Sequence, residues 1–167
     1  SHARKTGKAL DVGCGSGGRF ISRLQTRGFD ITGVDASIEM IKLARSHHPN
    51  VVFHHAEIQD WMTEDAFDFI VAWDSLFHLP LSAQEPVLRK LCGLLTDGGV
   101  LIHSFGDAIG NDEVDQWRGH EFQYSSIGVS ENLRVMIENG LKPLHLELDQ
   151  YPEKHVYSIA IKMAAQK

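Results

Sequence analysis

Two hydrophobic patterns alternate along this chain. Short, nearly continuous apolar runs are typical of buried strands, whereas apolar residues at every third or fourth position are typical of helices that pack on one face. The apolar runs predict five strands, at residues 8–12, 29–34, 51–54, 66–73 and 100–105. Helical spacing follows most of these runs, so the chain is predicted to alternate strands with helices.

Capping and turn residues set the ends of the predicted helices. The first helix covers residues 17–27, and the second begins after Ser37, which can cap it. The third begins at a capping box formed by Ser82 and Glu85. The sequence Asp-Gly-Gly at residues 97–99 is predicted to end that third helix before the fifth strand.

The second half of the chain has a different pattern of polar and apolar residues. Residues 106–129 are polar, rich in Gly and Asp, and aperiodic, which predicts a long irregular segment. Segments of this length in compact domains are usually functional or mobile, and we interpret this one as a substrate lid. A helix over residues 130–139 and two strands at 141–149 and 156–162 follow, and a short turn containing Pro152 joins these strands as an antiparallel pair.

The alternation of strands and helices predicts an α/β fold with a mostly parallel sheet and right-handed crossovers, closed by the antiparallel pair at one edge. In such sheets, ligands bind beyond the carboxyl ends of the strands, beside the first strand. Residues 13–18, Asp35, Glu57 and residues 73–79 all follow strand ends on that side. We therefore expect the ligand site there.

Composition narrows the class of protein. The chain has 167 residues, 43% hydrophobic and 23% charged, as expected of one globular domain over residues 1–167. A net charge of −6 argues against nucleic acid as the main partner. No apolar run is long enough for a membrane span, and no signal-peptide pattern precedes the first strand.

The two cysteines and the first residues of the chain give further expectations. Cys14 lies in a turn and Cys92 in a helical pattern, so we expect no disulfide and a cytoplasmic, reducing environment. The sequence begins Ser1-His2 without an initiator Met, as a tag remnant or a start after a disordered segment would. It predicts no oligomeric state.

The stretch at residues 10–18, Leu-Asp-Val-Gly-Cys-Gly-Ser-Gly-Gly, joins the first strand to the first helix. Glycines there let a ligand approach free backbone amides at the positive end of a helix dipole. Gly13, Gly15 and Gly18 match G-x-G-x-x-G, which fits NAD and several other cofactors. Asp11 at the strand end would repel a pyrophosphate but could hold a cationic group or orient the loop.

These features resemble the class I S-adenosylmethionine-dependent methyltransferase family over nearly the whole chain. Residues 10–17 are similar to its first motif, and Val-Asp-Ala-Ser at 34–37 to its second. Ala-Glu-Ile at 56–58, Phe-Asp-Phe-Ile-Val-Ala at 67–72 and Leu-Leu-Thr-Asp-Gly-Gly at 94–99 follow in the family's order. The resemblance implies a Rossmann-like three-layer sandwich with a seven-stranded sheet in the order 3-2-1-4-5-7-6 and strand 7 antiparallel.

The resemblance also implies roles for the matching residues. Asp35 would accept hydrogen bonds from both ribose hydroxyls, and Glu57 would accept one from the adenine amino group. Apolar residues would enclose the adenine, and the glycine turn would hold the methionine part. The implied cofactor-binding residues are Asp11, Gly13, Gly15, Gly17, Asp35, Ala36, Met40, Glu57, Ile58, Ala72 and Trp73.

Methyl transfer from a sulfonium mainly needs alignment and a dry site. A general base is required only where the nucleophile must lose a proton. His78 and Asp74 follow the fourth strand at the ligand edge and are the predicted catalytic residues; the other candidate bases are His103, His120 and His155. Trp73, Trp117, Phe122 and Tyr124 are aromatic residues that can line a substrate pocket or only pack.

Each candidate also has a purely structural interpretation. His78 can be a loop histidine without a chemical role, and His103 a hydrogen-bonded histidine of the sheet. The prediction is a methyltransferase that uses S-adenosylmethionine and a small-molecule acceptor, without metal, nucleic acid or membrane. The alternatives are a non-catalytic S-adenosylmethionine-binding module or partner subunit, and an NAD-dependent oxidoreductase.

Overall fold

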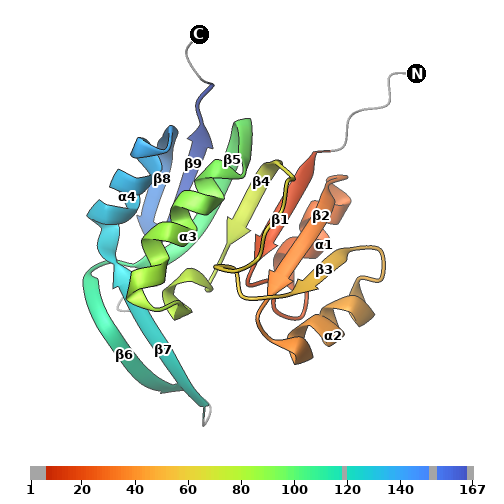
Figure 1. Ribbon diagram of the computed structural model, residues 1–167, viewed down its shortest axis with the longest axis horizontal. Helices are drawn as coiled ribbons and strands as arrows, with labels where there is room; N and C mark the ends of the chain where they lie inside the picture. Colours follow the sequence, from red (N-terminus) through yellow and green to blue (C-terminus); the bar gives the residue numbers. More distant parts are fainter. Residues whose placement is uncertain (1–6, 118–119, 151–153, 165–167) are drawn as a thin grey trace.

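The computed structural model describes residues 7–117, 120–150 and 154–164, with only the backbone for 111–117 and 120–123 (Figure 1). Seven strands form the main sheet in the order β3-β2-β1-β4-β5-β9-β8. These strands are β1 (Lys8–Val12), β2 (Asp30–Asp35), β3 (Val52–His55), β4 (Phe67–Ala72), β5 (Leu95–Gly106), β8 (Leu141–Leu148) and β9 (His155–Lys162). β1 to β5 pair in parallel, whereas β9 runs antiparallel to both β5 and β8. With β8 and β9 as the sixth and seventh strands, the predicted order and direction are confirmed.

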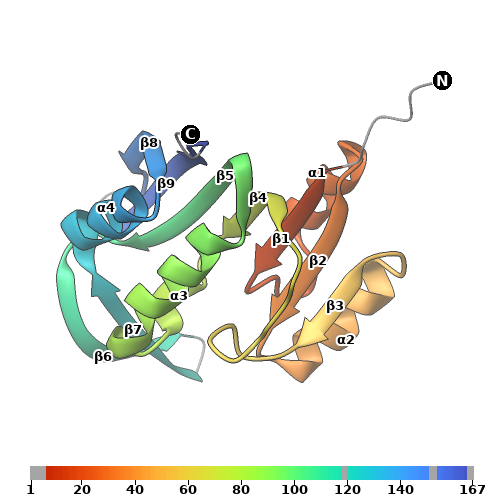
Figure 2. The same cartoon turned by 45° about the horizontal axis from the view of Figure 1, so that its top comes forward.

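Helices cover both faces of the sheet (Figures 1 and 2). They are α1 (Arg19–Thr26), α2 (Ile38–His47), α3 (Leu81–Gly93) and α4 (Gly128–Glu138), with a short 3-10 turn η1 (Leu76–His78). Because side chains alternate along a strand, Ala9 of β1 packs with α1 and α2, whereas Leu10 packs with α3 and α4. The result is a three-layer sandwich with one apolar core on each side of the sheet.

The segment at residues 106–129 is not irregular, so the prediction from its polar, aperiodic sequence is wrong. Residues 109–117 and 120–127 form an antiparallel pair, β6 (Ile109–Trp117) and β7 (His120–Ile127), separate from the main sheet (Figure 1). The backbone ladder joins these strands without the apolar alternation that marks a strand in sequence. The predicted turn at Pro152 lies outside the described residues.

The predicted ends of α3 are also wrong. Pro80, not Ser82, is the N-cap residue, and no side chain caps the helix. Its φ of −52° is already suited to a helix start. At the other end, α3 stops at Gly93, and residues 97–99 lie inside β5 rather than after the helix.

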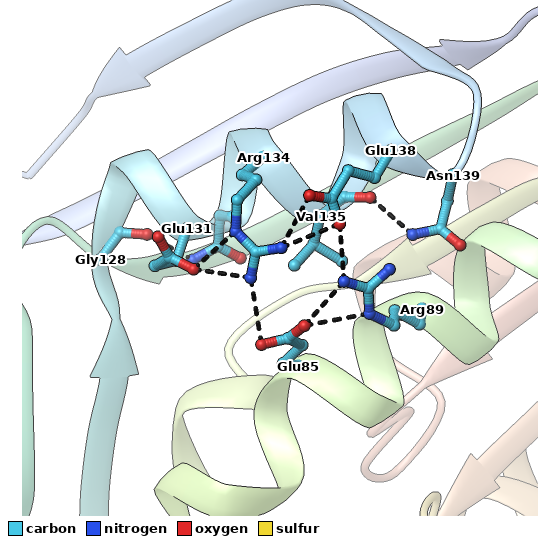
Figure 3. Close-up of polar contacts among 9 residues, drawn as sticks. Glu85, Arg89, Gly128, Glu131, Arg134, Val135, Glu138 and Asn139 are labelled. Atoms are coloured by element: carbon cyan, nitrogen blue, oxygen red, sulfur yellow. Dashed lines mark hydrogen bonds and ion pairs between the residues drawn. The ribbon is translucent and has the colours of Figure 1, made fainter.

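Glu85 is used between helices instead of in a capping box (Figure 3). Its carboxylate binds Arg89 on its own helix at 2.8 Å and Arg134 of α4 at 3.2 Å. Both arginines also bind Glu138, at 2.7 and 2.8 Å. The network connects α3 to α4 at a half-exposed surface, where solvent weakens each ion pair.

Two further observations bear on the sequence predictions. Cys14 and Cys92 are both buried and unbridged, as expected. Among the described residues, no helix is long and apolar enough to span a bilayer.

Candidate functional site

The glycine turn after β1 has the geometry that its sequence predicts. Gly13, Gly15 and Gly17 have φ values of 68°, 53° and 78°, a region that other residues rarely adopt. A Cβ atom on Gly13 would lie only 2.4 Å from the Cβ of Ser75, so no larger residue fits. Gly18 has no positive φ and is the N-cap of α1. The turn therefore leads directly into the start of that helix.

Two histidines at the end of α2 hold this turn, and neither was among the sequence candidates. His48 Nε2 lies 2.6 Å from the carbonyl oxygen of Gly17, and His47 Nδ1 lies 3.1 Å from that of Ser16. His48 Nδ1 is also 3.0 Å from Oε1 of Gln25 in α1. No local sequence signal marks them, because each contact joins segments 31 residues apart.

A cavity of about 340 Å³ opens at the carboxyl ends of the parallel strands. It is lined by Val12, Gly13, Val34, Asp35, Ala36, Ala56, Glu57, Ile58, Asp74, Ser75, Leu76, His78 and Leu79. We call it the first cavity. Its volume is within the range of small-molecule sites. The predicted adenosine residues are grouped here, apart from Met40, which is 41% exposed and does not line the cavity.

Asp35, at the end of β2, organises the entrance of the first cavity. Its Oδ2 accepts a hydrogen bond from the backbone N–H of Gly15 at 2.8 Å. Its Oδ1 accepts one from the N–H of Ser37, also at 2.8 Å. Each carboxylate oxygen can accept more than one hydrogen bond, so this side chain can fix the glycine turn and still bind a hydroxyl.

Lys90 of α3 shapes the other wall of the first cavity and was not a sequence candidate either, because it lies in the middle of a helix. Its ammonium donates to the carbonyl oxygens of Ile58 at 2.8 Å and Gln59 at 3.3 Å, and to that of Trp61. Burial lowers the pKa of this lysine. Three carbonyls on one ammonium hold the loop after β3 in place.

A second cavity of about 160 Å³ lies beside the first. Its lining residues are Asp11, Gly13, Cys14, Gly18, Arg19, Phe20, Trp73 and Asp74. Gly13 and Asp74 line both cavities, so one elongated ligand can extend from one to the other. Asp11 is only 4% exposed, and burial, with a smaller effect of the Asp35 charge, raises its pKa to about 7.

The stretch after β4 joins the two cavities. Ala72 is fully buried, whereas Trp73 contacts Phe20 with ring centroids 5.8 Å apart. Asp74 has a φ of 50°, the only non-glycine residue with a positive φ in the described part of the chain. Ser104 stabilises this conformation, because its Oγ accepts the Asp74 N–H at 2.8 Å. Non-glycine residues in this region are often functional.

The tertiary structure places the candidate histidines in different environments. His78, in η1, lines the first cavity. His103 is fully buried, with its ring nitrogens 3.1 Å from Asn132 Oδ1 and 3.0 Å from Ser158 Oγ. Burial lowers the pKa of His103 to about 4, so it is a neutral, hydrogen-bonded residue of the sheet core. The side chains of His120, Trp117 and Phe122 lie outside the described residues.

His155, at the start of β9, does reach the site. Its Nε2 lies 2.9 Å from Oδ1 of Asp74, and its Nδ1 is bonded to the carboxylate of Asp149. The register that pairs His155 with Gly106 of β5 places it there. Asp149 and Ser104 were not among the sequence candidates, because only strand pairing brings them near β4.

Known proteins are similar in sequence to part of this chain. The sequence model of the methyltransferase domain family matches residues 9–99. A trans-aconitate 2-methyltransferase of Escherichia coli O17:K52:H18 is 40% identical over 93 residues, which cover 54% of this chain and 36% of the relative. The same enzyme of Rhizobium etli is 28% identical over 104 residues, 62% of this chain and 40% of the relative. The chain thus spans well under half the length of these curated relatives.

Solved structures share the fold of this chain. An S-adenosylmethionine dependent methyltransferase from Mesorhizobium loti matches with a TM-score of 0.75 at 17% identity, over 96% of this chain and 94% of the other. The 1,6-didemethyltoxoflavin-N1-methyltransferase of Burkholderia thailandensis matches with a TM-score of 0.71 at 20% identity, over 95% and 72%. At this identity the likeness concerns the arrangement of the sheet and helices.

Proposed function

This chain belongs to the methyltransferase domain family, and from that premise we propose that it binds S-adenosylmethionine and transfers the methyl group to a small molecule. The main support for the proposal is the pair of adjoining cavities. Two cavities of about 340 and 160 Å³ share Gly13 and Asp74 beside the glycine turn. They offer room for an adenosine part and an amino-acid part of one ligand.

The first cavity suits the adenosine. Asp35 would accept hydrogen bonds from the ribose hydroxyls, which a carboxylate can do at both oxygens. Glu57 would accept one from the adenine amino group, and Ala36 and Ile58 provide apolar surface on this wall. Met40 would reach the adenine only by a change of its exposed side chain.

The second cavity suits the methionine part, a zwitterion. Asp11 lies beside the turn and would attract its ammonium, whereas Arg19 lines the same cavity and would attract its carboxylate. Gly13 lines the same cavity with backbone atoms alone, so the methionine part can approach the turn there without a side chain in between. The pyrophosphate of NAD fits this position less well, because the Asp11 carboxylate would repel it.

The bound cofactor would supply an activated methyl group on a sulfonium. The protein then needs to align the acceptor and exclude water. Asp74 and His78 line the first cavity and are the side chains we propose to contact the acceptor. The β6–β7 pair would act as the lid over it. A single domain over the whole chain, a cytoplasmic location and an acceptor other than nucleic acid also belong to this proposal.

Calorimetry and a methyl-transfer assay test the proposal together. We expect S-adenosylhomocysteine to bind with micromolar affinity and NAD to bind at least about a hundredfold more weakly. Radiolabelled S-adenosylmethionine should transfer its label to a member of a small-metabolite panel. Tight NAD binding without S-adenosylhomocysteine binding would indicate an oxidoreductase, and cofactor binding without any transfer would indicate a non-catalytic module.

A further inference from the structure

Aromatic rings from distant parts of the chain meet beside the two cavities. The Trp73 ring centroid lies 5.3 Å from that of Tyr157 and 5.6 Å from that of His155. Phe77 stacks on Tyr124 at 5.7 Å and contacts His155 edge-on at 6.2 Å. We call these five residues the aromatic cluster. They come from the end of β4, from η1, from β7 and from β9.

The aromatic cluster is not part of the core. Four of the rings are half-buried and the His155 side chain is 10% exposed, whereas the core phenylalanines Phe67 and Phe105 are 1% and 2% exposed. Trp73 lines the second cavity, and the half-buried rings keep part of their surface accessible to solvent. Aromatic rings prefer offset or edge-on partners at these distances, so a flat ring is the ligand shape that this cluster accommodates best.

The charge around the cluster is negative. Asp74 and Asp149 bind the two sides of His155. Asp107, the residue after β5, has a buried Oδ1 with no hydrogen-bond partner among the described residues. Lys154 adjoins His155 in the chain, but its side chain is exposed and lines neither cavity. Arg19 is the one Lys or Arg on the described walls of the two cavities, and it faces the methionine part.

His155 positions Asp74 rather than acting as a base. Its Nε2 lies against the Asp74 carboxylate, and its Nδ1 lies against that of Asp149 and 3.2 Å from Nε2 of Gln150. The ring therefore has both nitrogens engaged by other side chains. It holds Oδ1 of Asp74, to which Ser104 Oγ also donates at 3.4 Å. Oδ2 makes no hydrogen bond within the described residues, and the Asp74 side chain is 45% exposed.

We propose that the methyl acceptor is an aromatic amine or N-heterocycle that stacks in the aromatic cluster and directs its N–H toward Asp74; this rests on the proposed function. The lone pair of the amine nitrogen, or of the imine-type nitrogen of an azole ring, forms the new bond to the methyl carbon while the methyl–sulfur bond breaks and its electron pair stays on sulfur. The methylated product is cationic and releases its N–H proton to Asp74, from which the proton passes to water. The Asp74 carboxylate stabilises the positive charge that develops on nitrogen.

Other acceptor classes fit this surface less well. A polycarboxylate would place its charges beside Asp74, Asp107 and Asp149, and like charges at close range repel strongly where water is partly excluded. A phenol has to lose its proton as it attacks, and a carboxylate is a weak base for that proton. A neutral amine nitrogen already has its lone pair available, so the group facing it needs only to accept a proton afterwards.

A binding and transfer experiment on the whole chain tests the acceptor class. The protein is first saturated with S-adenosylhomocysteine, and its affinity for benzimidazole and aminoquinoline is compared with that for benzoate and trans-aconitate. We expect the two aromatic nitrogen compounds to bind about tenfold or more tightly, and label transfer from S-adenosylmethionine to nitrogen. Carboxylates that bind equally well, or the failure of both nitrogen compounds to bind, would overturn the proposal.

Two variants separate this proposal from the function on which it rests. Asp74→Asn should lower the transfer rate to the aromatic amine about tenfold or more, and Phe77→Leu should raise its KM about tenfold without changing kcat. Asp97→Asn, at the opposite end of β5, is the matched control and should change neither. If S-adenosylhomocysteine binds normally and Asp74→Asn transfers at the original rate, the acceptor proposal is wrong. If S-adenosylhomocysteine does not bind at all, the proposed function itself has failed.

Discussion

At the scale of single residues, the site is built around two carboxylates on adjacent strands. Asp11 on β1 is almost fully buried, whereas Asp35 on β2 is half-buried and accepts two backbone hydrogen bonds. Burial raises the pKa of Asp11 because it removes water from the carboxylate, and the Asp35 charge adds to that cost. A cationic ligand group would offset the cost, which is why this unfavourable burial is informative about the ligand.

The burial of Asp11 makes stability depend on pH. Its pKa is 3.8 in an open chain and about 7 in the fold. Below pH 4 it is neutral in both states, and between pH 4 and 7 only the unfolded chain ionises it, so stability is lost as pH rises through this window. The loss is at most about 4 kcal/mol. Asp11→Asn has no carboxyl group to ionise at this position and escapes the loss. In urea unfolding, the free energy of unfolding of the variant should therefore exceed that of the original protein by an amount that grows from about pH 4.5 to about pH 7.5.

Asp30→Asn, an exposed acid at the start of β2, is the control for that comparison. Its unfolding free energy should follow that of the original protein across the same pH range. If the curve of Asp11→Asn also runs parallel to that of the original protein, Asp11 ionises in the fold as it does in the unfolded chain, and its burial has no such effect.

The hydrogen bonds of Asp35 give a second prediction at this scale. Asp35→Ala removes two acceptors for the ribose and the anchor for the N–H groups of Gly15 and Ser37. A hydrogen bond to a charged group is worth about 1.5–3 kcal/mol, so affinity for S-adenosylhomocysteine should fall at least about tenfold in calorimetry. Asp30→Ala should bind as before. Unchanged affinity in Asp35→Ala, with an intact circular dichroism spectrum, would place the ribose elsewhere.

At the scale of elements, α3 connects the parts of the molecule. Its exposed side binds α4 through the ion pairs of Glu85 and Arg89 (Figure 3). Its buried residue Gln84 reaches the β6–β7 pair instead: Nε2 donates to the Ser125 carbonyl at 2.7 Å, and Oε1 accepts the Ile127 N–H at 3.2 Å. Lys90 holds the loop after β3. One helix thus fixes the walls of both the cofactor and the acceptor regions.

Replacement of Gln84 tests that connection. Gln84 is 5% exposed, so Gln84→Leu would leave buried polar groups of β7 without partners. Each such group costs about 1–3 kcal/mol, and we expect a loss of stability of that order in urea unfolding, together with faster amide exchange in β7. Affinity for S-adenosylhomocysteine should hardly change. A variant with the original stability and exchange would show that the β6–β7 pair is held by other contacts.

At the scale of the whole molecule, the two halves of the chain have different roles. The family match at residues 9–99 covers the strands that carry the proposed cofactor residues. The residues that we assign to the acceptor come partly from β7 and β9, beyond that match. A shared cofactor region with a different acceptor region is consistent with relatives that align over only part of their length. It also means that the acceptor has to be inferred from this chain's own residues.

If the whole chain is one domain, cofactor binding should stabilise all of it at once. The apolar cluster on one side of the sheet includes residues from β1 in the first half and from α4 and β9 in the second. We therefore expect one unfolding transition, stabilised by about 2.7 kcal/mol at a S-adenosylhomocysteine concentration of about one hundred times Kd. Calorimetric scanning measures it. Two transitions, of which the ligand moves only one, would contradict the single domain.

The sequence by itself determined the order of elements, the sheet and the cofactor edge. Apolar runs and helical spacing are local properties, so the alternation of strands and helices can be read from them. The strand order was implied by the family resemblance, and the structure confirms it. The positive φ angles of Gly13, Gly15 and Gly17 are a stereochemical requirement that is visible in the residue type. Asp35 and Glu57 could be placed for the same reason, because each follows the end of a predicted strand.

Only the tertiary structure decided the contacts that join distant segments. The contact of His155 with Asp74 depends on the register of β9 against β5. The contact of His48 with the Gly17 carbonyl depends on how α2 packs beside the glycine turn. The β6–β7 pair could not be read from the sequence because its strands lack the apolar runs or alternation that mark the strands of the main sheet. These contacts depend on packing between elements, and local periodicity carries no information about it.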